Sequence, residues 1–213
     1  MDFIKLFPNS ERIDDARKYL LEVYLTTKDY KQALGAIDKI QKKGPELQYA
    51  YQRIAYFQAI ERFNDEKLMV QRGAVKANFI EAIYYFNRSM TYNLDHKITA
   101  ECHYWKGEAY YRLDSLDKAL QCYQKFLASP VADQLPEARD VYYNIAYAYF
   151  TLKNYQKSAD AFRKYISENE KNKDRKLNDA FIKTADCYLL TRGYFTAAEF
   201  YNKAIALGLV KTD

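Results

Sequence analysis

The chain has 213 residues, of which 49% are hydrophobic and 29% charged, and its mean hydropathy is −0.54. This balance supplies enough apolar side chains for a buried core, and it excludes a disordered chain and one built around a membrane-spanning helix. Lys and Arg outnumber Asp and Glu by 33 to 28, but the signs alternate along the chain, which argues against a nucleic-acid-binding patch.

Composition also favours helices over strands. Glycine and proline are scarce, with 6 and 4 residues, which disfavours an all-β fold and glycine-rich phosphate loops. Tyrosine is abundant, with 22 residues, and its apolar ring with a polar hydroxyl suits half-buried surfaces. We therefore predict an all-α protein.

The N-terminal segment MDFIKLF is followed by Pro8-Asn9-Ser10. We expect residues 1–10 to be the tail of a preceding repeat, namely the end of a second helix and the loop after it. From this follows the hypothesis that the chain is a segment of a longer array or that a partner covers its ends. The segment lacks the long apolar run of a secretory signal.

Two helical hairpins are predicted next. In residues 14–47, Leu21 of a first helix precedes Ala33 of a second helix by twelve residues. In residues 50–94 the corresponding residues, Ala59 and Ala82, are 23 apart, and removing the eleven residues 68–78 restores the interval. We interpret 68–78 as an insertion at the hairpin tip, either a solvent-exposed extension or a docking or dimer-contact element. We expect a break at Gly73 and the start of the second helix at Asn78.

Three further copies, 100–131, 139–170 and 178–207, align without gaps. Each has a small residue in its first helix and another twelve positions later, in the pairs Gly107 and Ala119, Ala146 and Ser158, and Ala185 and Ala197. Small side chains let two antiparallel helices approach closely, and the next hairpin covers the apolar face that each leaves exposed. The pattern predicts one α-α superhelix of antiparallel hairpins, a single domain over 1–213.

This spacing resembles the tetratricopeptide repeat, and residues Ala100 to Val131 fit its pattern best. The resemblance covers about residues 14–207 as five units, whose second-helix anchors are 49, 37, 39 and 39 residues apart, against about 34 in the family. His103, Tyr142 and Phe181 occupy the family's Trp position. The chain resembles the repeat segments of long bacterial members, which implies a non-catalytic protein-binding scaffold.

Catalytic and metal-binding patterns are not found. The only two histidines, His96 and His103, are seven residues apart, unlike the paired ligands of zinc sites. Cys102, Cys122 and Cys187 lie in helical patterns, and we expect them to be buried free thiols. We predict no enzyme activity, no catalytic residues, no metal and no cofactor.

The first helices of such an array form a concave wall, and its predicted residues are mainly aromatic. Rings in a groove suit a peptide or protein partner, and acidic groups at the edges, Asp140, Asp179 and Asp186 among them, favour a basic or neutral one. The family's carboxylate clamp for chaperone tails is absent here. The candidate partner-binding residues are Tyr56, Tyr104, Glu108, Tyr111, Tyr143, Tyr147, Phe150 and Asp186.

Three alternatives remain at this point. The tyrosines can instead be scaffold packing between hairpins. The chain can also be a structural module that self-associates into a homo-oligomer, through open array ends or the 68–78 insertion. An RNA-binding repeat would need salt-sensitive affinity for single-stranded RNA, although we predict no nucleic-acid partner and no membrane insertion. Localisation is open: unpaired cysteines favour the cytoplasm, and a periplasmic location stays possible for a fragment.

Overall fold

The computed structural model describes residues 26, 29–65, 72–171 and 173–208, with residues 72–75 described by their backbone alone. In this part of the chain every regular element is a helix, which confirms the predicted all-α fold. The chain divides into two compact units, residues 1–113 and 114–213, each with a hydrophobic core of its own. The single array over 1–213 stays a prediction. Residues 1–10 and the first helix of the 14–47 hairpin lie outside the described ranges.

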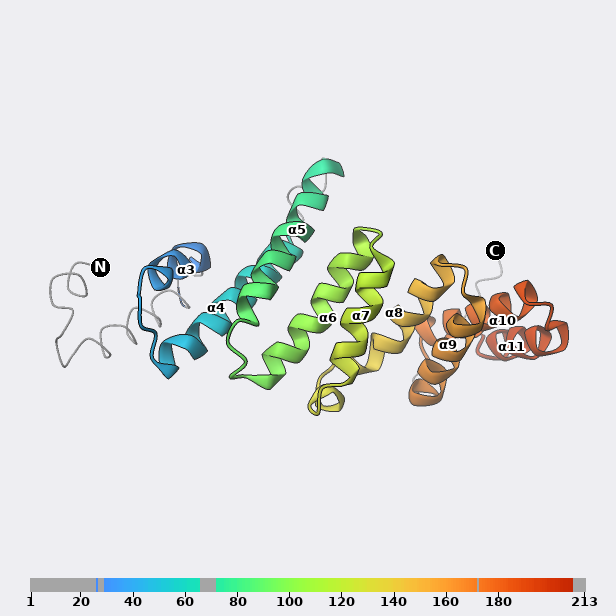
Figure 1. The fold of residues 1–213 in the computed structure, drawn as a ribbon. Helices are drawn as coiled ribbons and strands as arrows, with labels where there is room; N and C mark the ends of the chain where they lie inside the picture. The colour runs from blue at the N-terminus through green and yellow to red at the C-terminus, as the bar shows by residue number, and fades with distance from the viewer. Residues whose placement is uncertain (1–25, 27–28, 66–71, 172, 209–213) are drawn as a thin grey trace. The chain divides into compact units, whose positions relative to one another are not determined.

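The first unit contains four described helices: α3 (Tyr30–Asp38), α4 (Pro45–Phe63), α5 (Arg72–Ser89) and α6 (His96–Arg112). α4 and α5 form a hairpin, α3 packs on α4, and α6 packs on both α5 and α4 (Figure 1). The predicted small residues Ala59 and Ala82 are both fully buried in the core, together with Ile54 and Phe86. The small residues therefore lie where the helices of the unit pack together.

The tip of the α4–α5 hairpin differs from the sequence prediction. α5 begins at Arg72 and runs through Gly73 and Asn78 without interruption, so the predicted break and the predicted helix start are both wrong. The side chain of Asn78 is buried, and its Nδ2 donates to the backbone oxygen of Asp65 at 3.4 Å, so it ties α5 to the end of α4 instead of capping a helix. One glycine costs a helix only about 1 kcal/mol, and the residues around it favour helix. Residues 68–71 of the insertion lie outside the described ranges.

A buried glutamine on α4 fixes the connection between α5 and α6. Gln52 is fully buried, and its Oε1 accepts hydrogen bonds from the backbone nitrogens of Leu94 and Asp95 at 3.1 and 2.8 Å. Its Nε2 donates to the Asp95 oxygen and to Thr99 Oγ1, both at 3.0 Å. The Asp95 side chain in turn caps α6. One amide thus positions the start of the next hairpin's first helix.

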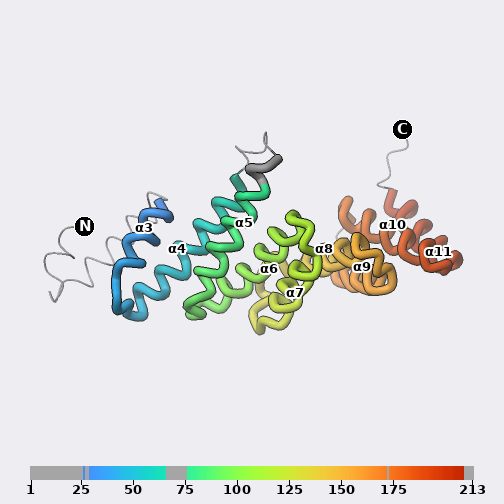
Figure 2. The backbone as a smooth tube through the Cα atoms, turned by 45° about the horizontal axis from the view of Figure 1, so that its top comes forward, coloured from blue at the N-terminus to red at the C-terminus, as the bar shows by residue number. Residues whose placement is uncertain are grey.

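The second unit contains α7 (Leu116–Leu127), the short 3₁₀ helix η2 (Ala132–Gln134), α8 (Ala138–Thr151), α9 (Tyr155–Asn169), α10 (Arg175–Leu190) and α11 (Tyr194–Ala206). α8 with α9 and α10 with α11 form two successive hairpins, visible in Figure 2. α7 packs on α8, and α9 packs on α10 as well as on α8. Each second helix therefore covers the first helix of the following hairpin, as the repeat requires.

The close approach expected at the small residues is seen directly in the second unit. Ser158 Oγ of α9 donates to the backbone oxygen of Ala146 in α8 at 2.9 Å, and the two residues are twelve positions apart. Cys187 Sγ of α10 lies 3.4 Å from the same hydroxyl. Ala185 and Ala197, the corresponding pair of the next hairpin, are 0% and 2% exposed. The prediction of contact through small side chains is confirmed for the α8–α9 hairpin.

The turns that follow α6, α8 and α10 share a backbone feature that the sequence did not reveal. Asp114, Lys153 and Arg192 have positive φ angles of 58°, 59° and 66°, and successive members are 39 residues apart. After α8, the nitrogens of Lys153 and Asn154 donate to the oxygens of Phe150 and Tyr149. This pair of backbone hydrogen bonds defines a Schellman motif, in which glycine is the usual left-handed residue.

Candidate interaction surface

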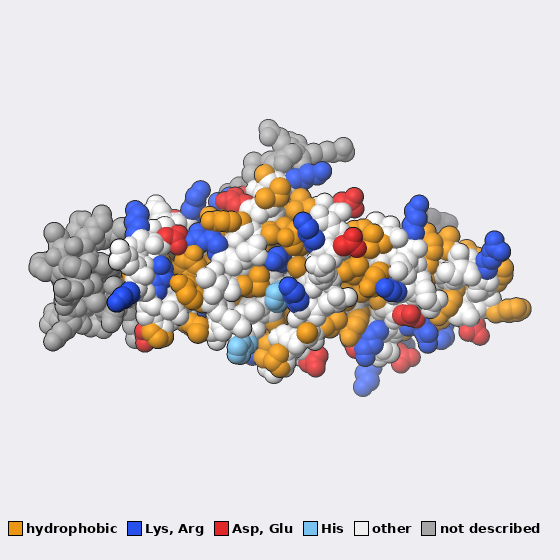
Figure 3. Space-filling view, viewed as in Figure 1, with side chains coloured by type: hydrophobic (Ala, Val, Ile, Leu, Met, Phe, Trp, Pro, Cys, Tyr) orange, Lys and Arg blue, Asp and Glu red, His pale blue; other side chains and the backbone are white. Residues whose placement is uncertain are grey.

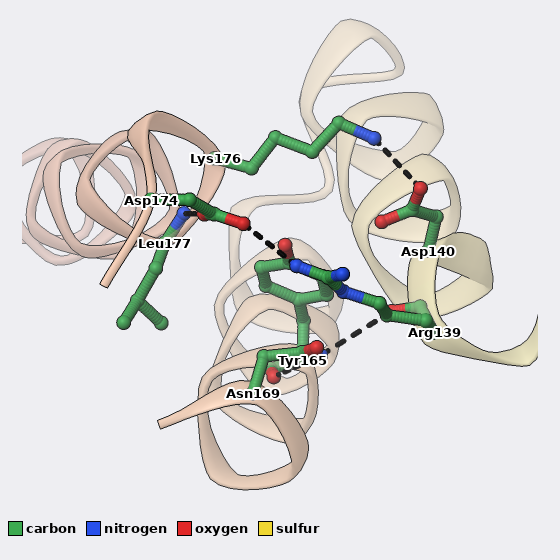
Figure 4. A network of polar contacts seen from close by, with 7 residues as sticks. All are labelled: Arg139, Asp140, Tyr165, Asn169, Asp174, Lys176 and Leu177. Atoms are coloured by element: carbon green, nitrogen blue, oxygen red, sulfur yellow. Dashed lines mark hydrogen bonds and ion pairs between the residues drawn. The ribbon is translucent and has the colours of Figure 1, made fainter. Parts of the chain in front are cut away.

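α8 and α10 lie side by side in the second unit and run parallel. Arg139 is ion-paired with Asp174, and Asp140 with Lys176, each at 2.7 Å (Figure 4). The paired residues are 35 and 36 positions apart, so each α8 residue is joined to α10 about one helical turn before the position 39 residues later that is its repeat equivalent. Because these side chains are partly exposed, each pair contributes at most about 1 kcal/mol, and their main effect is on register.

α9 packs on both α8 and α10. Asn169 Nδ2 donates to the Arg139 oxygen at 3.3 Å and to the Tyr165 oxygen at 2.9 Å. The Tyr165 side chain is fully buried. Burial, followed by the nearby charges of Asp174 and Asp140, raises the pKa of its hydroxyl to about 12. Tyr165 is therefore neutral at physiological pH and acts as a packing residue.

Two tyrosines of α8 converge on one carboxylate of α10. The hydroxyls of Tyr143 and Tyr147 donate to Asp179 Oδ2 at 2.9 and 2.5 Å. Their rings lie 4.9 Å apart, and both contact Phe162 of α9, at 5.9 and 5.3 Å between ring centres. Burial raises the pKa of both hydroxyls above the ordinary value, so both remain donors near neutral pH. Both rings are half-buried and held in one orientation.

A second group of contacts lies about one helical turn further along α8 and α10. Lys183 Nζ of α10 lies 5.3 Å from the ring centre of Phe150 and 2.9 Å from Asp186 Oδ2. Tyr201 of α11 donates to Asp186 Oδ1 at 2.7 Å. This hydrogen bond, and then burial, raises the pKa of the Tyr201 hydroxyl to about 12. The carboxylate of Asp186 is therefore already paired within the chain.

These two groups make up what we call the α8–α10 surface, and all of its members are half-buried. It contains four of the eight predicted binding residues together with two neighbours. Asp179 was expected only as an acidic group at the edge, and Lys183 was not expected at all. Asp179 is 36 residues after Tyr143 and 32 after Tyr147, which is one to two helical turns less than the 39-residue repeat, so a search at those shorter intervals would have pointed to it. The members of the α8–α10 surface are Tyr143, Tyr147, Phe150, Asp179, Lys183 and Asp186.

The other four predicted residues lie in the first unit. Tyr56 of α4 is half-buried, and its ring packs on Phe57 and on Phe86 of α5. Tyr104 of α6 is only 7% exposed and contacts the edge of its neighbour Trp105. Most of the Tyr104 ring is thus part of the packing. Glu108 and Tyr111 are half-buried on the same helix.

The potential metal ligands and thiols in the described residues are unclustered or buried. No set of three or more His, Cys, Asp or Glu side chains there is arranged to hold a metal ion. Cys102, Cys122 and Cys187 are buried free thiols, and burial raises the pKa of Cys102 to about 12, which disfavours the nucleophilic thiolate. None of the described helices combines the length and the apolar character needed to cross a membrane.

Charge is mixed over the visible surface. On the face seen in Figure 3, basic and acidic side chains are interspersed with each other and with hydrophobic ones. The arrangement agrees with the alternating signs of the sequence. Mixed charge of this kind does not make the continuous basic track that binds a nucleic-acid backbone.

Comparison with known proteins places the fold. A family model of the tetratricopeptide repeat matches residues 104–173. MamA from Desulfovibrio magneticus RS-1 is similar at 16% identity and a TM-score of 0.54, over 93% of this chain and 97% of that one. BtubC from P. vanneervenii is similar at 12% identity and a TM-score of 0.59, over 92% and 79%. For a putative kinesin light chain from Podospora anserina with nearly identical TPR-like repeats, the values are 12%, 0.52, 91% and 93%.

At these identities the structural likeness shows the fold alone, and no curated protein sequence matches the chain. The family match includes the whole of the α8–α9 hairpin, where the small-residue contact is seen directly. The spacing of the sequence, the helical hairpins and the family match agree: residues 104–173 match the tetratricopeptide repeat, and the described residues share the fold of the similar structures.

Proposed function

We propose that the chain is a non-catalytic scaffold that binds a peptide or protein partner on the concave face of its first helices. In the second unit, the α8–α10 surface is the part of that face that contacts the partner. The observation that carries this is the pair of half-buried rings of Tyr143 and Tyr147, held against Phe162 and fixed through their hydroxyls.

Fixed rings are well suited to binding. A free tyrosine side chain loses rotamer freedom when it docks, whereas these two have already lost it in the folded chain. Aromatic side chains also provide large contact area with a polar tip, and they are enriched among the residues that dominate binding energy. Phe150 extends the same row along α8, under Lys183. This favours an extended segment over a small ligand in a deep pocket.

Selection from a phage library of short random peptides tests the proposal. The selected peptides are synthesised, and their dissociation constants are measured by fluorescence anisotropy. We expect Phe150→Ala and Tyr147→Ala each to weaken binding by about tenfold or more, as truncated hot-spot residues do. Tyr84→Ala is the matched control, because Tyr84 is 55% exposed on α5, a second helix.

The proposal fails if selection yields no specific peptide. It also fails if the two α8 variants bind the selected peptides as tightly as the wild type does. Circular dichroism of each variant establishes that a loss of binding is not a loss of fold.

One observation favours a second candidate, a structural module that self-associates through α11. Phe195, Ile205 and Tyr194 are 93%, 66% and 62% exposed on this helix. Ile166, the residue one repeat before Ile205, is only 9% exposed and packs with Leu177 and Phe181 of α10. At Ile205, α11 thus exposes a side chain whose counterpart on α9 is buried against the following helix.

Light scattering over a range of concentrations tests this candidate. If α11 mediates self-association, the apparent mass rises with concentration and Ile205→Glu abolishes the rise. Ile80→Glu is the control, since Ile80 is 60% exposed on α5. A constant monomer mass, or equal effects of the two variants, contradicts self-association through α11.

A further inference from the structure

We propose that Asp179 receives a basic side chain, Lys or Arg, from the partner segment bound on the α8–α10 surface. The inference rests on the proposed function and specifies the chemistry of its partner. It follows from the distribution of charge over α8 and α10.

Three carboxylates of α8 and α10 belong to this surface or take part in the ion pairs between the same two helices, and two of the three are paired with lysines within the chain. Asp140 is paired with Lys176 at 2.7 Å, and Asp186 with Lys183 at 2.9 Å. Asp179, between them, accepts hydrogen bonds from the two tyrosine hydroxyls and has no Lys or Arg partner among the described residues. The two lysines nearest to it in sequence are the ones already engaged.

The two tyrosines reduce the charge of Asp179 without cancelling it. Burial raises the pKa of both hydroxyls, so they stay protonated as neutral donors. A neutral phenol brings no positive charge to balance the carboxylate. A carboxylate has about four sites for accepting hydrogen bonds, and the tyrosines occupy two of them. Asp179 is only partly buried. A cationic donor can therefore reach it from solvent. The attraction between the two charges is stronger at a half-buried carboxylate than at a fully exposed one.

In the part of the chain that the structure describes, two of the three aromatic rings of this surface already have a lysine ammonium group over them, and the third does not. Lys176 Nζ lies 5.7 Å from the ring centre of Tyr143, and Lys183 Nζ lies 5.3 Å from that of Phe150. Tyr147 lies between these two rings on α8, and no cation among the described residues sits over it. Rings of this kind attract cations, most strongly when the site is shielded from water. A partner's basic side chain at Asp179 would complete a row in which basic groups alternate with carboxylates.

The competing explanation is that Asp179 only joins α8 to α10. A double-mutant cycle separates the two. The wild-type protein and Asp179→Asn are each measured with a selected peptide and with the same peptide carrying citrulline, the neutral isostere of arginine. We expect the Arg-to-citrulline change to weaken wild-type binding at least about fivefold and to have little effect on Asp179→Asn, as coupling between close charge pairs predicts.

Controls address structure and charge. Asp160→Asn removes an exposed carboxylate from α9 and should leave the arginine effect intact. Tyr147→Phe deletes one hydroxyl but keeps the carboxylate, and should also keep the preference for the basic residue. A peptide with Lys in the same position shows whether the site prefers an ammonium or a guanidinium group, and binding of either supports the proposal.

Two results overturn the inference while the proposed function stands. One is that the selected peptides bind at Phe150 but carry no basic residue at a fixed position. The other is that Asp179→Asn weakens the arginine and citrulline peptides equally, as a purely structural bridge would. If no peptide depends on Phe150, it is the proposed function itself that fails.

Discussion

The contact between Ser158 and Ala146 gives the sharpest stability prediction. Ser158 is fully buried, and its hydroxyl lies 2.9 Å from the Ala146 oxygen on the facing helix. Leucine at this position has no room without moving α8 from α9. Overpacking costs about 1–3 kcal/mol and the lost hydrogen bond about 1 kcal/mol, so Ser158→Leu should destabilise the protein by about 2–4 kcal/mol.

Ser167→Leu is a matched control, because Ser167 is exposed on the same helix and its hydroxyl bonds only to Lys164 within that helix. Urea denaturation followed by circular dichroism measures both variants against the wild type. For a chain of this length the Ser158→Leu loss corresponds to roughly 5–15 °C in melting temperature, whereas the control should change stability by at most about 0.5 kcal/mol. Equal stability of the two variants would refute the close-packing argument.

Three further changes have definite expected outcomes. Lys153→Gly should raise stability by about 0.5–1 kcal/mol in urea titration, because Lys153 has a positive φ that glycine adopts without strain. Gln52→Leu should cost about 1–3 kcal/mol in the same assay, since it removes the fully buried amide that accepts part-buried hydrogen bonds from the backbone nitrogens of Leu94 and Asp95. Cys102, whose thiol pKa is raised from 9.0 to about 12, should resist iodoacetamide at pH 8 until urea unfolds the chain; stability from this group is present below pH 9 and falls as the pH rises toward 12.

Much of the fold could be predicted because its physical cause repeats in the sequence. The interval of twelve between small residues marks where two helices touch, and Ser158 with Ala146 shows that contact. The failures have local causes. Asn78 looked like a helix start because asparagine is a good cap, but its buried side chain bonds to Asp65 across the hairpin, a tertiary contact that no local pattern encodes. The left-handed turn residues, such as Lys153, escaped notice because glycine normally marks that conformation.

The candidate site was predictable only as a set of positions. Residue spacing placed Tyr143, Tyr147 and Phe150 on one side of a first helix. In the structure the two tyrosines contact each other, and Phe150 is linked to Asp186 through Lys183. Residue spacing did not reveal the role of Asp179, since that role depends on which carboxylates already have a lysine or arginine partner. Tyr104 shows the opposite limit. The pattern gave its position on the helix but not its burial to 7% exposure.

Site-specific photo-crosslinking locates a bound peptide on the chain without relying on a loss of affinity. A benzoylphenylalanine replaces Phe150 in one protein and Gln156, which is exposed on α9, in another. Each is irradiated with a selected arginine-containing peptide, and the products are mapped by mass spectrometry. We predict a crosslink from position 150 that excess unlabelled peptide suppresses, and none from position 156. A crosslink from position 156 alone would place the binding site on the second helices and contradict binding on the α8–α10 surface.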